Sequence, residues 1–360
     1  MSTQKIVSVL LTFTLMLTCL VGCGDTAGQN SVAGGSAPAA SDAGGAGDSG
    51  AEKITIRFAH NLTTESVEHD AVVYLQKLLA EKSGGNIEMT IFPGAQMGSV
   101  TDVMDKVGRG DLEMSAGTTT NFVQSIPEFA VWDFFYMFDD IEHAYRVLDS
   151  ETGTKMLEPY KQKGVTGLSY MTTGFRHISN SKRPINTAED VKGLKMRGYN
   201  PIQIKAWESL GCSMASISWD ELFTALQQNL VDGQECAIAG FWQQKFFEAQ
   251  KYLSLSGHVY TNWVVFINTD FYEGMSEENR NIITECVREA TTYQRQKMDE
   301  TEADLLKKLA DAGCEINEIP LEERRKMGEV MNAAIKDDII AQCGQDVYDM
   351  VMAEVEKQRQ

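Results

Sequence analysis

The stretch that decides the fold reads KITIRFAHNLTTESVEHDAVVYLQKLLAEKSGGNIEMTIF, from Lys53 to Phe92. Polar and apolar residues alternate over Lys53–Ala59, with the two-residue period of a β-strand. Apolar side chains then recur at helical spacing within Glu65–Ser83, and Gly84–Gly85 ends that helix. A second alternating run, Asn86–Phe92, indicates another strand. Strand, helix and strand form the unit of a largely parallel sheet, so this stretch predicts an α/β fold.

The same alternation continues along the chain. A helix over Ser99–Gly108 and a short strand over Leu112–Ala116 extend the first unit. The strands expected in the second half are Val165–Tyr170, Gly174–Ser179, Leu194–Arg197, Val231–Glu235, Tyr252–Leu255 and Val259–Asn268. The helices expected there are a short one capped by Asn186 or Thr187, then Pro201–Leu210, Trp219–Asn229 and one near Phe241–Gln250. The length of 360 residues favours two domains.

One long helix is expected from Ser276 to Ala312, because this segment contains no glycine or proline. At 1.5 Å per residue it would be roughly 55 Å long, well beyond the diameter of a small domain. Its middle, Gln294–Thr301, is nearly all polar. A helix of this kind is expected to run across the back of two domains, and the alternative is two shorter helices with an unmarked break. Further helices are expected over Leu321–Gln342 and after Gly344.

The N-terminus has the pattern of an export signal. Lys5 precedes an apolar run, Ile6–Leu20, that is short for a membrane span. The residues that follow, up to Cys23, resemble a bacterial lipobox, in which the cysteine is lipidated; the alternative is an ordinary signal peptide. We therefore expect a lipoprotein signal over 1–23 and a flexible linker rich in Gly, Ala, Ser and Asp over 24–52. These features predict an extracytoplasmic protein that is lipid-anchored to the cell membrane.

The composition excludes several classes of function. The formal net charge of −19 argues against a nucleic-acid partner, which would require a basic face. The cysteines outside the signal are odd in number and widely spaced without CxxC, so neither a disulfide framework nor a metal site is expected. They are Cys212, Cys236, Cys286, Cys314 and Cys343. The chain has none of the common catalytic or nucleotide-binding motifs, so we expect no cofactor and no enzymatic activity.

Two isolated arginines, Arg176 and Arg197, lie near the ends of expected strands. Ligands of open α/β sheets bind beyond the carboxyl ends of the strands, and a guanidinium grips a carboxylate with two parallel hydrogen bonds. Glu235 is an acid suited to hold Arg197 when the site is empty. The alternative is that both arginines form solvated pairs on the surface.

Separate blocks along the chain resemble one known family. In order they are IRFAH (Ile56–His60), PGAQMGS (Pro93–Ser99), PEFAVWD (Pro127–Asp133), GFRHISNSKRPI (Gly174–Ile185), GLKMR (Gly193–Arg197), WDELFTALQQNLVDGQE (Trp219–Glu235) and QKFFEAQKYLSLSGHVY (Gln244–Tyr260). They resemble the DctP-type solute receptors of tripartite ATP-independent periplasmic (TRAP) transporters. The resemblance covers 53–360 and implies a two-lobed periplasmic-binding-protein-like fold with a long helix bridging both lobes. Lobe I would comprise 53–173 plus 262–300, and lobe II would comprise 174–261 plus 301–360.

The resemblance also implies roles for residues. In that family the arginine of the GLKxR block forms the bidentate salt bridge to the ligand carboxylate, which is Arg197 here. Arg176 is implied as a second contact, and Glu235 as the acid that steadies Arg197. The next residue is usually an asparagine whose amide touches the carboxylate, but this chain has Cys236, whose thiol is a weak donor. Tyr199 stands in the place of a usual proline and is expected to reshape the wall of the pocket.

Other wall residues follow from the same alignment. Asn61 follows the first strand, and Trp219 is expected to pack on the ligand. Thr118 and Asn121 stand where sialic-acid receptors carry an acid and an extra arginine, which argues against sialic acid. Trp219 as a plain core aromatic is the alternative.

The implied function is capture of a small organic acid and its delivery to membrane permease subunits of the DctQ and DctM kind. A dicarboxylate, a sugar acid, a keto acid and an aromatic acid all remain open as the ligand. Two other readings share the bilobed fold: a receptor that feeds an ABC importer, and an extracellular sensor that passes the ligand to a signalling receptor. The neighbouring genes would separate these interpretations: genes for two integral membrane proteins, with no gene for an ATPase, would favour the TRAP interpretation.

Overall fold

A computed structural model describes residues 53–359. The predicted signal, the predicted lipidation site Cys23 and the predicted linker lie outside the described residues. Within 53–359, no helix combines the length and the apolar character that crossing a membrane requires.

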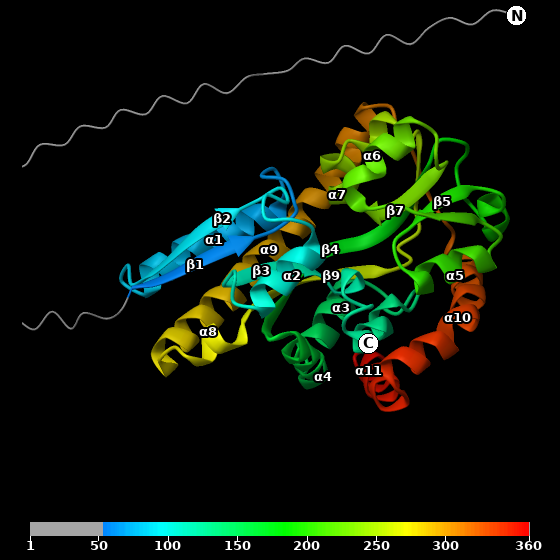
Figure 1. Cartoon of the computed structure of the whole chain (residues 1–360). Coiled ribbons are helices and arrows are strands. Elements are labelled where there is room, and N and C mark those ends of the chain that lie inside the picture. The colour runs from blue at the N-terminus through cyan, green and yellow to red at the C-terminus, as the bar shows by residue number, and fades with distance from the viewer. Residues whose placement is uncertain (1–52, 360) are drawn as a thin grey trace, which may run out of the picture. The chain divides into compact units, whose positions relative to one another are not determined.

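The first lobe is built on three parallel strands. Strand β1 (Ile54–Ala59) pairs with β2 (Ile87–Phe92) on one side and with β3 (Met114–Thr118) on the other. The helices α1 (Val67–Lys82) and α2 (Val100–Gly108) make the crossovers between these strands. The strand–helix–strand pattern that the sequence predicts is confirmed, and Figure 1 shows these strands and helices in blue and cyan.

Two antiparallel strands pass from the first lobe into the second. Strand β9 (Tyr260–Asn268) pairs with β3 and with the first part of β4 (Val165–Asn180). From Arg176 onward, β4 pairs with β7 (Gly233–Ala237) instead. The sequence predicted two strands here, but the structure has one, in which the register shifts between Thr172 and Gly174. Gly174 has φ of 90°, a left-handed conformation that favours glycine, so the strand bends at this point without ending.

The second lobe continues the sheet from β7. Strand β5 (Lys195–Gly198) lies parallel to β7 and to β6 (Ser213–Ser216), while β8 (Tyr252–Leu255) pairs with the end of β4 and with β10 (Glu315–Glu318). The four-residue strands β6 and β10 were not predicted. The helices of this part are α5 (Pro201–Ser209), α6 (Trp219–Gln227) and α7 (Ile238–Gln243).

Helix α9 (Glu277–Asp311) is continuous, which confirms the long helix and rules out the unmarked break. Ser276 caps it as expected, since its side chain accepts a hydrogen bond from the Asn279 N–H. Ile283 and Val287 belong to the apolar core of the first lobe, whereas Met298 and Leu309 belong to that of the second. Figure 1 shows α9 running from beside α8 to beside α7. One helix therefore braces both lobes.

The polar middle of α9 holds the bend in β4. Gln294 is fully buried, and its side chain both accepts from the Thr172 N–H at 3.0 Å and donates to the Thr172 carbonyl at 2.7 Å. Beside it, Arg295 donates to the Tyr170 carbonyl and pairs with Asp149. Two polar residues in the middle of α9, Gln294 and Arg295, therefore provide hydrogen bonds for backbone groups of β4 beside its register shift, and do not face solvent alone.

A third apolar cluster includes residues of α10 and α11. The remaining helices are α3 (Ile141–Leu148), α4 (Glu151–Lys155), α8 (Thr269–Glu273), α10 (Leu321–Cys343) and α11 (Gln345–Lys357). Short 3-10 segments are η1 (Thr119–Asn121), η2 (Pro127–Asp133), η3 (Glu158–Lys163), η4 (Ala188–Val191) and η5 (Phe246–Glu248). The five cysteines of the described residues are all buried and free.

Replacing Gln294 by leucine tests the brace between α9 and β4. The variant keeps the size of the side chain but leaves the Thr172 N–H and carbonyl buried without partners. We expect the free energy of unfolding to fall by about 2–4 kcal/mol, as measured by chemical denaturation. The control is Gln296→Leu, the same change at an exposed position of the same helix, where a loss of about 0.5 kcal/mol or less is expected. Equal losses in the two variants would contradict the brace.

Candidate functional site

Residues of both lobes line one cleft. Its empty volume is about 700 Å³, a figure that includes the open space at its mouth. The first lobe contributes Asn61 after β1, Glu68 of α1 and Thr118 at the end of β3. The second lobe contributes Arg176 of β4 and Arg197 of β5. The cleft therefore lies at strand ends, where ligands of open α/β sheets bind.

Most of the residues predicted for the site lie together in this cleft. Seven of them line it: Asn61, Thr118, Arg176, Arg197, Tyr199, Trp219 and Cys236. The eighth, Glu235, is 1% exposed and lies behind Arg176 without lining the cleft. The two arginines are buried, so the alternative of solvated surface pairs is wrong.

The acid of the site pairs with the other arginine. Glu235 accepts from Arg176 Nε at 2.5 Å and from Arg176 Nη2 at 2.8 Å, and its backbone carbonyl also accepts from that Nη2 at 2.6 Å. The expectation that Glu235 holds Arg197 is therefore wrong. The reason is the strand pairing: β4 and β7 are adjacent, and Arg176 lies opposite Ala237, close to the acid two residues earlier.

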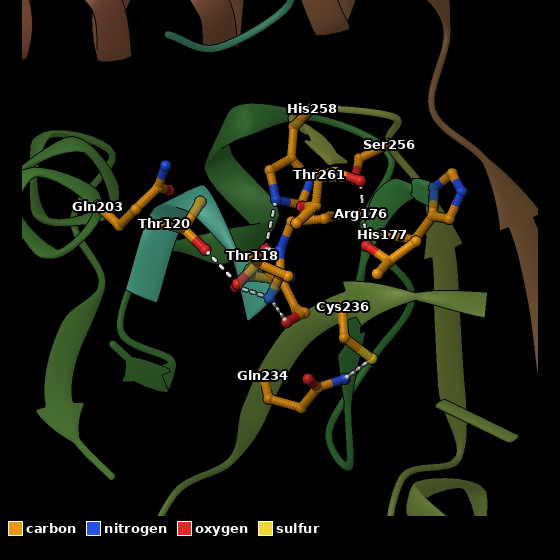
Figure 2. A network of polar contacts seen from close by, with 12 residues as sticks. Thr118, Thr120, Arg176, His177, Gln203, Gln234, Cys236, Ser256, His258 and Thr261 are labelled. Carbon is orange, nitrogen blue, oxygen red and sulfur yellow. Dashed lines mark hydrogen bonds and ion pairs between the residues drawn. The ribbon is translucent and has the colours of Figure 1, made fainter. Parts of the chain in front are cut away.

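A histidine completes the environment of Glu235. Nε2 of His258 lies 2.9 Å from Glu235 Oε2, and Nδ1 lies 2.7 Å from Ser256 Oγ. Burial lowers the pKa of His258, so the neutral ring donates from Nε2 to the carboxylate and accepts from the Ser256 hydroxyl. Burial alone would raise the pKa of Glu235, but the charge of Arg176 outweighs it and lowers that pKa to about 2. Figure 2 shows Arg176 and His258 close together in this network. Arg176 and Glu235 both stay ionised, so their charges cancel.

Arg197 has no comparable partner. It is 5% exposed, and its Nε–H donates to the Ile217 carbonyl at 2.9 Å. No carboxylate within 53–359 lies at ion-pair distance from its guanidinium. Burial and the nearby charge of Arg176 lower the pKa of Arg197 to about 10, so it remains protonated at neutral pH. An uncompensated cation at the wall of a cleft is suited to bind an anion.

Tyr199 lies against both guanidinium groups. Its ring centroid is 5.0 Å from Cζ of Arg176 and 5.0 Å from Cζ of Arg197, and Trp219 covers Arg197 at 5.9 Å. Contacts of this kind stabilise a cation through the quadrupole of the ring. Tyr199 therefore lies in the wall of the cleft, in contact with both arginines, and its effect on the ligand stays a prediction.

The segment after β5 explains how Tyr199 is held. Asn200 caps α5 by accepting from the Gln203 N–H at 2.8 Å, and it donates to Asp133 at 2.9 Å. Pro201 follows at the first helical position, where it is favoured. Gly198 is tightly packed, since an added Cβ would lie 2.4 Å from Ile204 Cγ1. The tyrosine is thus fixed between a packed strand end and a capped helix.

Cys236 lies on β7 with its side chain 2% exposed. Gln234 Nε2 donates to its sulfur at 3.2 Å, and Figure 2 shows this contact. Burial raises the pKa of the thiol to about 12, which keeps it neutral and unreactive at ordinary pH. The position therefore offers a weak donor beside the arginines and no nucleophile.

The sequence analysis missed one charged residue of the cleft. Glu68 lines it and is 3% exposed, in the first turn of α1. Of its neighbours, Glu65 is exposed, whereas His69 is half-buried, with Nδ1 3.0 Å from His60 Nε2. Acids are ordinary in the first turn of any helix, so no signal in the sequence separated Glu68 from its neighbours. Among the described residues, no group of His, Cys, Asp and Glu is arranged to hold a metal.

Comparison with known proteins gives a consistent family. A family model described as bacterial extracellular solute-binding protein, family 7, matches residues 58–342. The chain is 29% identical over 284 residues to the 2,3-diketo-L-gulonate-binding periplasmic protein YiaO of Escherichia coli (strain K12), covering 79% of this chain and 86% of that protein. It is 27% identical over 306 residues to the C4-dicarboxylate-binding periplasmic protein DctP of Rhodobacter capsulatus, covering 84% and 91%.

Solved structures agree with this match. The sugar acid binding protein DctPAm of Advenella mimigardefordensis strain DPN7T, in complex with galactonate, superposes with a TM-score of 0.81 at 30% identity. The match covers 86% of this chain and 99% of that one. A TRAP periplasmic solute binding protein of Ochrobactrum anthropi superposes with a TM-score of 0.80 at 30% identity, covering 85% and 96%.

These findings confirm the two-lobed α/β fold with its bridging helix. The family consists of solute receptors, which confirms the expectation that the chain is not an enzyme. Its match spans most of the chain. The chain therefore belongs to the DctP family of bacterial extracellular solute-binding proteins, the extracytoplasmic receptors of TRAP transporters.

Proposed function

We propose that this chain captures a small organic acid through a bidentate salt bridge between the ligand carboxylate and Arg197. The observation that carries the proposal is the state of Arg197: a buried, protonated guanidinium at the cleft without a carboxylate partner within the described residues. A bound carboxylate would supply the missing counter-charge and accept from the Nη atoms. Each charge-assisted hydrogen bond contributes about 1.5–3 kcal/mol, so the pair would supply much of the binding energy of a small acid.

Arg176 has a secondary role in this proposal. Glu235 already neutralises it, so Arg176 contributes hydrogen bonds and shape rather than net charge. Asn61, Thr118, Trp219 and Cys236 then contact the rest of the ligand from both lobes. The ligands of two relatives, galactonate for DctPAm and 2,3-diketo-L-gulonate for YiaO, support an organic acid with hydroxyl or keto groups.

The lobes are proposed to close over the ligand. Lobe I comprises 53–173 plus 262–300, and lobe II comprises 174–261 plus 301–360. The register shift of β4 between Thr172 and Gly174 supports this boundary, because it lies just before Arg176, where the strand changes its partner from β9 to β7. Closure is favoured only by contacts that the open state lacks, and a ligand held by both lobes supplies such contacts.

The place of the protein in the cell follows the same proposal. A signal over 1–23 directs export, lipidation of Cys23 anchors the receptor to the membrane, and residues 24–52 tether it. The closed receptor delivers its ligand to DctQ- and DctM-type permease subunits. The TRAP relatives support this assembly.

Replacing Arg197 by alanine should reduce affinity for the bound acid by roughly 100-fold or more, because both charge-assisted hydrogen bonds are lost. Ligand-induced thermal stabilisation should nearly vanish in a melting-shift screen against organic acids. Arg197→Lys should restore little, because an ammonium cannot present two parallel donors.

The matched control for Arg197 is Arg109→Ala, at an exposed arginine paired with Asp111. Its melting shifts should equal those of the wild type. Shifts of wild-type size in Arg197→Ala would reject the proposed salt bridge.

Replacing Cys236 by asparagine should change the ranking of organic acids, because an amide donor then stands beside the arginines. The melting temperature without ligand should stay within about 4 °C of the wild type. Cys236→Ser serves as the control for loss of the thiol alone. An unchanged ligand ranking in the asparagine variant would remove Cys236 from the site.

A further inference from the structure

The charges that line the cleft match a ligand with a single anionic group. Among the described residues that line it, Arg176 and Arg197 are the only arginines or lysines. Glu235 neutralises Arg176 through two short contacts, so Arg197 is the single cation left without a partner. One ligand carboxylate balances that charge. A second carboxylate in the same buried space would have no cation to pair with, which is strongly unfavourable.

Glu68 faces the cleft from the other lobe. It lies in the first turn of α1, whereas both arginines lie on strands of the second lobe. The side chain lines the cleft at 3% exposure, and its Oε2 atom is buried without a hydrogen-bond partner among residues 53–359. No lysine or arginine of that range forms an ion pair with it. A carboxyl group in this position requires a hydrogen-bonding partner from the ligand and repels a second carboxylate.

Two aromatic side chains also present unused polar atoms. Trp219 Nε1 and the Tyr199 hydroxyl are buried without hydrogen-bond partners in the described part of the chain. The Trp219 indole N–H only donates a hydrogen bond, whereas the Glu68 carboxylate, when ionised, only accepts one. A ligand hydroxyl both donates and accepts, so a polyhydroxylated ligand can satisfy the indole and the carboxylate.

We propose that Glu68 is a specificity-determining residue of the cleft, which hydrogen-bonds to a hydroxyl of the ligand and discriminates against a second carboxylate. The preferred ligand is then a polyhydroxylated monocarboxylate of the aldonate class and not a dicarboxylate. This inference rests on the proposed binding of one carboxylate by Arg197.

The protonation of Glu68 is consistent with this role. Burial raises the pKa of its carboxyl group to about 7. Above that pH the ionised form predominates, which accepts a hydrogen bond from a ligand hydroxyl and repels a second carboxylate. Below it the neutral form still bonds to a hydroxyl but no longer repels a carboxylate, so the discrimination should weaken as the pH falls through about 7.

The experiment compares ligands that differ only at one end. D-Galactonate and galactarate share a six-carbon chain, and erythronate and meso-tartrate share a four-carbon chain; in each pair one terminal hydroxymethyl group is replaced by a carboxylate. Dissociation constants are measured by calorimetry for the wild type, Glu68→Gln, Glu68→Leu and a control variant. The control is Glu65→Gln, which changes an exposed glutamate just before the start of α1. Glutamine keeps the size and hydrogen bonding but removes the charge, and leucine removes both.

In at least one pair, the wild type should bind the monocarboxylate at least about tenfold more tightly than its dicarboxylate partner. Glu68→Gln should reduce this ratio about tenfold, mainly by tighter binding of the dicarboxylate. Glu68→Leu should weaken binding of the monocarboxylate about tenfold, because the ligand hydroxyl loses its partner. Glu65→Gln should leave every constant unchanged.

The inference is overturned if the wild type binds the dicarboxylates as tightly as the monocarboxylates, or if Glu68→Gln leaves the ratio unchanged. In either case the Arg197→Ala variant separates the two proposals. If that variant still loses the binding of the acids, the salt bridge stands and only the role of Glu68 fails. If the wild type binds none of the four acids and Arg197→Ala matches the wild type against the wider organic-acid screen, both proposals fail.

Discussion

The site depends on the ion pair between Arg176 and Glu235. Both side chains are buried, and the pair is held by two direct contacts and by His258 behind the carboxylate. A buried pair of this kind adds little net stability, but it removes one positive charge from the cleft. Because Arg176 is neutralised, Arg197 is the group whose charge the ligand would match in the proposed binding mode. A strand pairing between β4 and β7 thus determines which arginine is available to an anion.

Strand β4 also connects the site to the segment that joins the two lobes. Strand β4 carries Arg176 just after it has left β9, and Gln294 of the bridging helix satisfies the backbone at the bend. The bend, the brace and the ligand contact therefore lie within a few residues of one another. A ligand held by groups of both lobes acts directly on the segment that joins them, which fits the proposed closure of a solute receptor.

Much of this architecture could be predicted from the sequence, and the limits have physical causes. The long helix was predictable because Ser276 caps a segment without glycine or proline. The two arginines were predictable because the GFR and GLKMR blocks that carry them resemble those of a known receptor family. The partner of Glu235 was not, since that depends on which strands are neighbours. Glu68 was missed because burial in the cleft leaves no trace in a first helical turn that normally carries acids. The bend in β4 was expected to be a break between two strands, because a glycine such as Gly174, here with a positive φ, ordinarily marks the end of a strand.

The most direct test is a crystal structure of the protein with the organic acid that gives the largest melting shift. The account predicts the ligand carboxylate in the cleft, with two oxygens at about 2.7–2.9 Å from the guanidinium nitrogens of Arg197. It also predicts that Glu235 remains on Arg176. A carboxylate bound away from Arg197, or one that displaces Glu235 from Arg176 and pairs there, would contradict it.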